Sequence, residues 1–262
     1  MRRCRMDRRG WACAAAIFVA LTGVGTRVAH AQDRTEAQAE AARAFASLRA
    51  AHPERMPRLA DAEAGPVLHA LADPGALGSD DLAAVSRVCG RAREAALAYV
   101  SFGVEQGAQP AAVRAADNAA AYQDELALLQ PFLAHCIARQ VPLAEATLRQ
   151  LDPELVGLLR LGGLRRGQAG VLQLYASLAS AVGDARFGRA YVDALLGALA
   201  EAAPAHARAL AVDARAVPRD LAAGQLAVAQ GERKSAWQKV LDAMSDTRCE
   251  ALCELAARNG SR

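Results

Sequence analysis

Residues 79–106, SDDLAAVSRVCGRAREAALAYVSFGVEQ, are the stretch that best indicates the fold class. Apolar or small residues recur along it at alternating steps of four and three: Val85, Cys89, Ala92, Ala96, Tyr99 and Gly103. This spacing places them on one face of a helix with 3.6 residues per turn. Ser79 or Asp80 is a suitable N-cap. We therefore expect a long helix from there to about Gln106, with one face in a core.

The same pattern continues on both sides of this stretch, between proline and glycine breaks. A second apolar stripe runs from Ala115 to Cys136, and Pro131 lies inside it, so we expect a kink or a split there. Pro142 is expected to open a further short helix. The sequence therefore predicts an all-α protein, an irregular bundle of about nine helices forming one compact domain.

The expected domain, residues 32–262, is divided into three parts by its composition. Residues 33–202 form the main helical body, and residues 234–262 are expected to form two C-terminal helices. Residues 203–233 are rich in alanine and contain prolines and glycines. We expect them to form short helices or a partly ordered connector.

The overall composition excludes several classes of protein. The hydrophobic content, 53%, is too high for a disordered chain. The aromatic content, 4%, is too low for a β-sandwich or barrel. Of 31 basic and 28 acidic residues, six arginines and one aspartate lie in residues 1–31, leaving 25 basic and 27 acidic residues in the remainder. That remainder lacks the net positive charge that nucleic-acid binding requires, so we expect no nucleic-acid partner.

Residues 1–31 have the three-part organisation of a secretory signal peptide. Arginines crowd the start, an apolar run of fifteen residues follows, and Ala29 and Ala31 are the small residues that signal peptidase admits. Cleavage after Ala31 would leave Gln32 as the new N-terminus. The apolar run is shorter than the roughly 20 residues needed to span a bilayer. We therefore expect a periplasmic protein whose mature chain has no membrane span.

The start of this leader resembles a twin-arginine export signal. Arg8 and Arg9 precede Trp11, as an arginine pair precedes an aromatic or apolar start in that signal. However, Asp7 stands where the pattern prefers Ser or Thr, and Trp11 where it prefers Phe. We therefore favour the general secretory (Sec) route over the twin-arginine (Tat) route.

An even number of cysteines in an exported chain indicates disulfide bonds. Two of the six cysteines leave with the leader, and the four that remain are Cys89, Cys136, Cys249 and Cys253. Only the last two have a spacing typical of zinc ligands, so we expect neither a metal site nor a cofactor.

Helix geometry favours one disulfide pairing over the others. If residues 80–106 and 110–130 form a hairpin, Cys89 and Cys136 are out of register by about 15 Å, at 1.5 Å per residue. Cys249 and Cys253 are one helical turn apart, with Cβ atoms about 5–6 Å from each other, which is wider than the roughly 3.5–4.5 Å of a disulfide. We therefore prefer both C-terminal cysteines bridging to Cys89 and Cys136. The pairing 89–136 with 249–253 is the alternative, and buried free thiols are the remaining one.

No arrangement of residues indicates catalysis. The chain has neither an HExxH zinc motif nor a G-x-S-x-G nucleophile elbow. The adjacent carboxylates Asp124 and Glu125 diverge on a helix, which argues against paired acid–base chemistry. We therefore expect a protein that is not an enzyme.

Besides an enzyme whose catalytic residues come together only in the fold, two functions remain open. The first is a non-catalytic helical protein that binds another protein, such as an envelope or secretion accessory. The second is a carrier of an apolar small molecule or lipid. The aromatic residues that could line its cavity are Tyr99, Tyr122, Tyr175 and Phe187. The sequence indicates neither the partner nor the oligomeric state.

Overall fold

The computed structural model describes residues 33–104, 109–152 and 161–260. These ranges contain ten α-helices and no β-strand, which confirms the all-α prediction and its approximate number of helices. Two 3₁₀ helices, η1 (Pro74–Leu77) and η3 (Asp213–Arg215), join neighbouring elements. The α-helices are residues 33–51, α2 (Ala64–Leu71), α3 (Leu82–Val100), α4 (Ala111–Ala121), α5 (Gln123–Arg149), α7 (Leu161–Gly183), α8 (Arg189–Ala209), α9 (Ala216–Leu226), α10 (Gly231–Ser245) and α11 (Ala251–Gly260).

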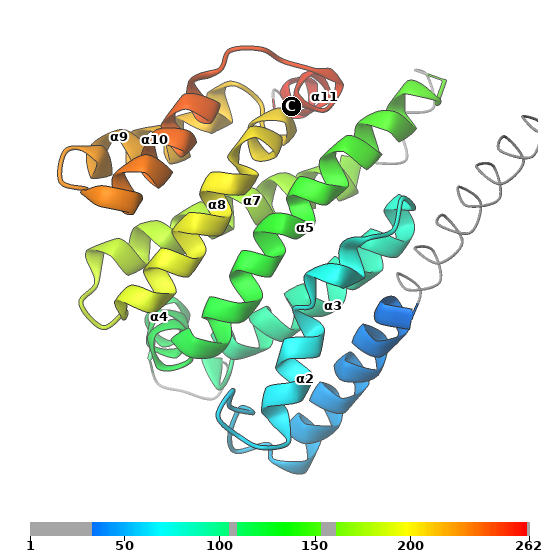
Figure 1. The fold of residues 1–262 in the computed structure, drawn as a ribbon, viewed down its shortest axis with the longest axis vertical. Helices are drawn as coiled ribbons and strands as arrows, with labels where there is room; N and C mark the ends of the chain where they lie inside the picture. The colour runs from blue at the N-terminus through cyan, green and yellow to red at the C-terminus, as the bar shows by residue number, and fades with distance from the viewer. Residues whose placement is uncertain (1–32, 105–108, 153–160, 261–262) are drawn as a thin grey trace, which may run out of the picture.

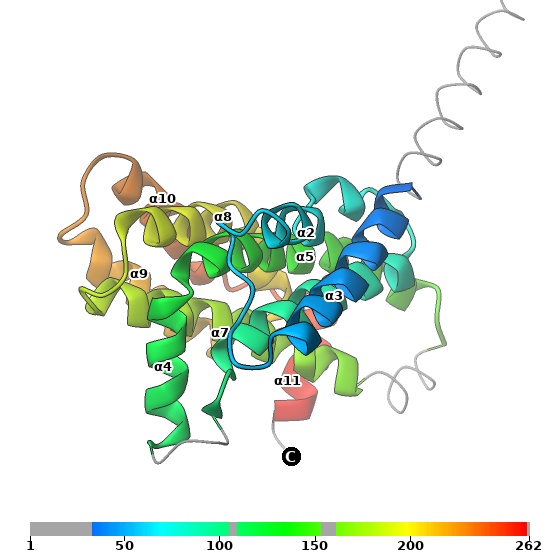
Figure 2. The same ribbon diagram turned by 90° about the horizontal axis from the view of Figure 1, so that it is seen from below.

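Helices α5 and α8 form the middle of the bundle, where they lie side by side along most of their length (Figure 1). Helix α3 packs against α5, and α10 packs against α8. The N-terminal elements therefore cover one side of the central pair, while α9 and α10 cover the other (Figure 1). Helix α4 projects from the body of the bundle (Figure 2).

One continuous cluster of buried side chains extends from Ala41 to Met244. Its larger members are leucines, tyrosines, Phe45, Phe132 and Trp237, and alanines fill much of the remaining contact surface. Ala134 of α5 and Ala203 of α8 are fully buried. Small side chains let helix backbones approach closely, which is how an alanine-rich chain fills a core to normal density.

The helix of residues 33–51 is fixed to the bundle by a buried amide, that of Gln38. Its Nε2 donates hydrogen bonds to the carbonyl oxygens of Leu71, at 3.3 Å, and Val88, at 2.8 Å. Its Oε1 accepts from Nη1 of Arg91 at 3.1 Å. Because all these partners lie on α2 and α3, this one side chain sets how three helices meet.

The chain breaks at Tyr122 and not at Pro131, where we expected a kink or a split. Tyr122 has φ −112° and ψ 28°, outside helical values, and it separates α4 from α5. Helix α5 then continues for 27 residues through both Pro131 and Pro142. The prediction that Pro142 opens a helix of its own is therefore wrong. Contacts with α3 and α8 on both sides offset the hydrogen bonds that the prolines cannot make.

The alanine-rich residues 203–233 include the end of α8, the short η3, helix α9 and the first residues of α10. Pro204 lies inside α8, and Ala222 of α9 is fully buried. Across the ranges that the structure describes, no helix combines the length and the apolar character needed to cross a bilayer.

Candidate functional site

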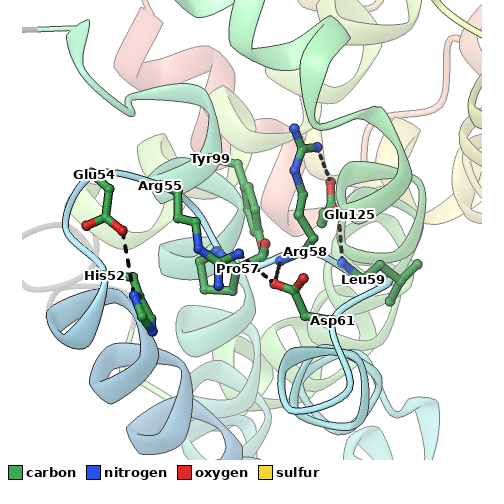
Figure 3. A network of polar contacts seen from close by, with 9 residues as sticks. All are labelled: His52, Glu54, Arg55, Pro57, Arg58, Leu59, Asp61, Tyr99 and Glu125. Atoms are coloured by element: carbon green, nitrogen blue, oxygen red, sulfur yellow. Dashed lines mark hydrogen bonds and ion pairs between the residues drawn. The ribbon is translucent and has the colours of Figure 1, made fainter.

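Residues 52–63 form a non-helical loop between the first described helix and α2. Pro53 follows the end of that helix, as expected from its missing backbone N–H and fixed φ. Most of the polar contacts that hold this loop converge on a small region next to α3 and α5 (Figure 3). The loop is therefore a fixed part of the surface, although it belongs to no helix.

The inner side of the loop is held by two buried polar groups. The hydroxyl of Tyr99, on α3, donates to the carbonyl oxygen of Pro57 at 2.7 Å. The backbone N–H of Leu59 donates to Oε1 of Glu125, on α5, at 2.7 Å, and that Glu125 side chain is only 3% exposed. Burial raises the pKa of Tyr99 far above its usual range, so its hydroxyl stays a donor. Met56, in the loop itself, belongs to the buried core and is 1% exposed.

Arg58 joins the loop to the break between α4 and α5. Its Nη1 donates to the carbonyl oxygen of Ala121 at 2.6 Å and lies 3.5 Å from Oε2 of Glu125. Its guanidinium carbon also lies 4.2 Å from the centre of the Tyr122 ring, in cation–π geometry. The residue at which the helix breaks thus also supports the loop.

Asp61 closes the loop on itself. Its Oδ2 accepts from the backbone N–H of Arg58 at 2.9 Å and from Nη1 of Arg55 at 3.2 Å (Figure 3). These bonds, the one from the Arg58 backbone first, hold the pKa of Asp61 below its usual value. Asp61 therefore stays ionised and keeps the chain reversal in place.

A cavity of about 350 Å³ opens beside the loop. Its lining includes the charged or titratable residues His52, Arg55, Asp61 and Glu63 together with apolar Leu48 and Pro57. On the outer side, Nδ1 of His52 lies 3.6 Å from Oε1 of Glu54, and both side chains are more than half exposed. This mixture of donors and acceptors suits recognition of polar groups on a partner.

The polar groups of the site serve mainly to hold the loop. Its contacts are hydrogen bonds and ion pairs that fix the loop, and no serine or cysteine lines the cavity. Within the described residues, no cluster of three or more His, Cys, Asp or Glu could hold a metal ion.

A second concavity, a groove of about 570 Å³, lies between α2, η1 and α5. Its floor includes Leu128, Pro131 and Phe132 of α5, and His69 and His135 belong to its lining. It is more open than the first cavity and more apolar in composition.

The four aromatic residues expected around a ligand lie in three different places. Tyr99 and Tyr122 contact each other, with ring centres 5.3 Å apart, next to the loop. Tyr175 is fully buried in α7 against His206, and Phe187 stacks on Tyr191. Neither of the two concavities described above has any of the four in its lining.

The cysteines pair as Cys89–Cys136 and Cys249–Cys253, so our preferred pairing is wrong and the alternative is correct. The Cα atoms are 5.7 Å and 5.2 Å apart, within the normal range for disulfides. The break at Tyr122 lets α5 fold back along α3, which removes the expected mismatch. Helix α11 begins at Ala251, so Cys249 lies before the helix and can approach Cys253.

The proposed export signal and cleavage site lie outside the described residues. These positions are Arg8, Arg9 and Trp11, and then Ala29, Ala31 and Gln32.

The sequence did not reveal two polar residues that hold the loop, Arg58 and Glu125. In the sequence, Glu125 stands out only as the neighbour of Asp124, and helix periodicity points the two side chains in different directions. The signal that could have identified Glu125 is its position, because it is an acidic residue on the apolar stripe of its own helix.

Comparisons of this chain with protein-family models, with curated proteins and with solved structures find no match.

Proposed function

We propose that this chain is an exported, periplasmic, non-catalytic helical protein that binds another protein, and that the loop of residues 52–63 is its recognition surface. The observation that carries the proposal is the contrast between the two sides of this loop. Its inner side is fixed by the buried Tyr99 and Glu125, while its outer side presents His52, Glu54 and Arg55 to solvent.

A loop fixed in this way is suited to binding. Burying the carboxylate of Glu125 costs free energy unless its partners are well placed, and here those partners belong to the loop. A loop that is already ordered loses little conformational entropy when a partner docks. Binding residues are commonly found on loops that a rigid scaffold holds in place.

The periplasmic location rests on two independent features. The leader has the composition of a secretory signal, for which we favour the Sec route over the Tat route. The four remaining cysteines form two disulfides, which persist in oxidising compartments and are rare in the cytosol.

The binding proposal is tested by affinity capture from envelope extract with three baits. These are the protein without residues 1–31, its His52→Ala/Glu54→Ala variant, and an Arg219→Ala/Asp220→Ala control that removes a comparably exposed ion pair from α9. We expect the wild type and the control to retain the same protein and the loop variant to lose it. Retention by all three baits, or no protein above background, would contradict the proposal.

A carrier of an apolar small molecule is the second candidate, favoured by the groove between α2 and α5. Its volume falls within the range of roughly 300–1,000 Å³ that is typical of ligand sites, and Leu128, Pro131 and Phe132 lie along it. An apolar fluorescent dye should then bind the wild type and bind the Leu128→Glu variant less tightly. The matched control is Leu97→Glu, on an exposed position of α3. Equal dye binding by both variants would reject this candidate.

A further inference from the structure

The disulfide Cys249–Cys253 has two chemically different sulfur atoms. Cys249 lies in the non-helical segment between α10 and α11 and is partly exposed. Cys253 lies in the first turn of α11 and is fully buried. Of the two cysteines, Cys249 is therefore the one with exposure to solvent, and a thiol in solution would approach the bond from its side.

The buried sulfur is in contact with a cation. Nη2 of Arg215 lies 3.4 Å from Sγ of Cys253, and the Arg215 side chain is almost completely buried. Arg215 also donates two hydrogen bonds to the carbonyl oxygen of Leu210, at 3.2 and 3.3 Å, and one to that of Asp246.

All these acceptors are neutral, so no hydrogen-bonded anion balances the Arg215 charge among the described residues. The carboxylate of Asp246 acts on Arg215 only through space, because its oxygens bind Arg248 at 2.6 to 3.1 Å. A thiolate at Cys253 would place a negative charge directly against this guanidinium.

We propose that Cys249–Cys253 is a redox-active disulfide that exchanges electrons with a dithiol, which in the cell is a thiol–disulfide oxidoreductase. A thiolate of the dithiol attacks Sγ of Cys249 and forms a mixed disulfide. The Cys249–Cys253 bond breaks, and Cys253 leaves as a thiolate facing Arg215. The second thiolate of the dithiol then attacks the first sulfur of the same dithiol, which is bonded to Sγ of Cys249 in the mixed disulfide. This step closes the disulfide of the dithiol and releases Cys249 as a thiolate. The dithiol loses two electrons to become a disulfide, and this protein gains two electrons as a pair of thiols.

The chemistry of exchange explains why these positions suit the reaction. The rate depends on access to the attacked sulfur and on how well the leaving thiolate is stabilised. Cys249 supplies the access, and Arg215 supplies the stabilisation. This inference does not depend on the proposed recognition loop, which lies on other elements.

The first test is differential reduction of the folded wild-type protein with dithiothreitol, followed by alkylation and peptide mapping. We expect Cys249 and Cys253 to become alkylated at a dithiothreitol concentration about ten-fold or more below that needed for Cys89 and Cys136. Simultaneous reduction of both bonds, or earlier reduction of Cys89–Cys136, would overturn the proposal.

The second test separates the roles of the two sulfur atoms with a matched pair of variants. Cys253→Ser leaves the accessible Cys249, and it should form a mixed disulfide with oxidised glutathione. Cys249→Ser leaves the buried Cys253, and it should react at least about ten-fold more slowly. Equal rates in the two variants would contradict the assignment of Cys249 as the attacked sulfur.

The third test concerns Arg215. Two proteins are compared, the Cys249→Ser variant and the Cys249→Ser/Arg215→Met double variant. The thiolate absorbance of Cys253 should persist to lower pH in the first, which keeps Arg215, than in the second. An unchanged absorbance profile would remove Arg215 from the mechanism. Should Arg215→Met fail to fold, Arg215→Lys retains a cation and provides the same comparison against Arg215→Gln.

Discussion

The two disulfides of this protein occupy opposite environments. Cys89–Cys136 joins α3 to α5 across the core, both cysteines are buried, and 47 residues separate them in sequence. Cys249–Cys253 closes a loop of four residues within one segment at the edge of the bundle. The first bond holds together helices that are distant in sequence. The second constrains only a local conformation.

Chain entropy predicts unequal contributions to stability. In the loop-closure model, a separation of 47 residues corresponds to about 4 kcal/mol and a separation of four to about 2 kcal/mol at 25 °C. The buried guanidinium next to Cys253 adds a chemical difference, because it stabilises the reduced form of the C-terminal pair alone. The core disulfide is thus suited to stability and the C-terminal one to exchange.

The largest effect is expected from removing the core disulfide. The Cys89→Ala/Cys136→Ala variant should lower the free energy of unfolding by about 4 kcal/mol, because the unfolded chain regains loop entropy. Urea denaturation followed by circular dichroism measures this difference. If this variant lost less free energy of unfolding than the variant without Cys249–Cys253, the core disulfide would not be the more stabilising of the two.

The core should also be more sensitive to acid than the C-terminal segment, because it contains the buried His206. Burial lowers the pKa of His206 to about 4, from an ordinary value of 6.5. Between pH 6.5 and pH 4 the unfolded chain therefore binds a proton that the folded protein does not. The free energy of unfolding should fall by about 3 kcal/mol over this range, at about 1.4 kcal/mol per pKa unit.

This acid effect is checked by urea denaturation of the wild type and of His206→Gln at several pH values. The variant should show a shallower dependence on pH between 6.5 and 4, whatever its stability at neutral pH. Parallel curves for the two proteins would show that His206 does not cause the acid sensitivity.

Removal of the C-terminal disulfide is the third prediction. The Cys249→Ala/Cys253→Ala variant should lose about 2 kcal/mol, half the loss of the core variant, because the loop it closes is short. The same urea experiment measures it, and hydrogen exchange should show the loosening confined to α11 and its neighbours. Faster exchange throughout α3 and α5 would mean that the two regions are coupled.

The smallest effect should come from Asp246, in the C-terminal segment. Hydrogen bonds from Arg248 lower the pKa of Asp246 to about 2, from 3.8. Its contribution is present above pH 3.8 and is lost as the pH falls toward 2, well below the range in which His206 acts. Asp246→Asn should therefore lower the curve slightly but evenly between pH 6.5 and 4 and leave its slope there unchanged, as measured by denaturation at each pH.

The helices were predictable because their signal is local. The stripe from Val85 to Gly103 requires only a period of 3.6 residues, and α3 does cover most of it. Proline was a poorer guide, because its cost of about 3 kcal/mol can be offset by packing. Helix α5 passes through Pro131 and Pro142 for this reason.

The candidate loop was only partly predictable. Pro53 indicates that the helix before it ends, but nothing near residues 52–63 in sequence shows that Tyr99 and Glu125 hold them. These partners lie 42 and 66 residues away along the chain. An acid on a helix is ordinarily exposed, so its burial depends on what the rest of the fold places opposite it.

The sequence by itself determined the class of fold and the presence of disulfides, because helix periodicity and cysteine number are properties of the chain. The tertiary structure alone decided which cysteines pair, because the break at Tyr122 sets where α5 lies against α3. It also decided that Arg215 meets Cys253 and that Glu125 meets the loop. Such contacts depend on how helices pack in three dimensions, and residues distant in sequence meet only after that packing has formed.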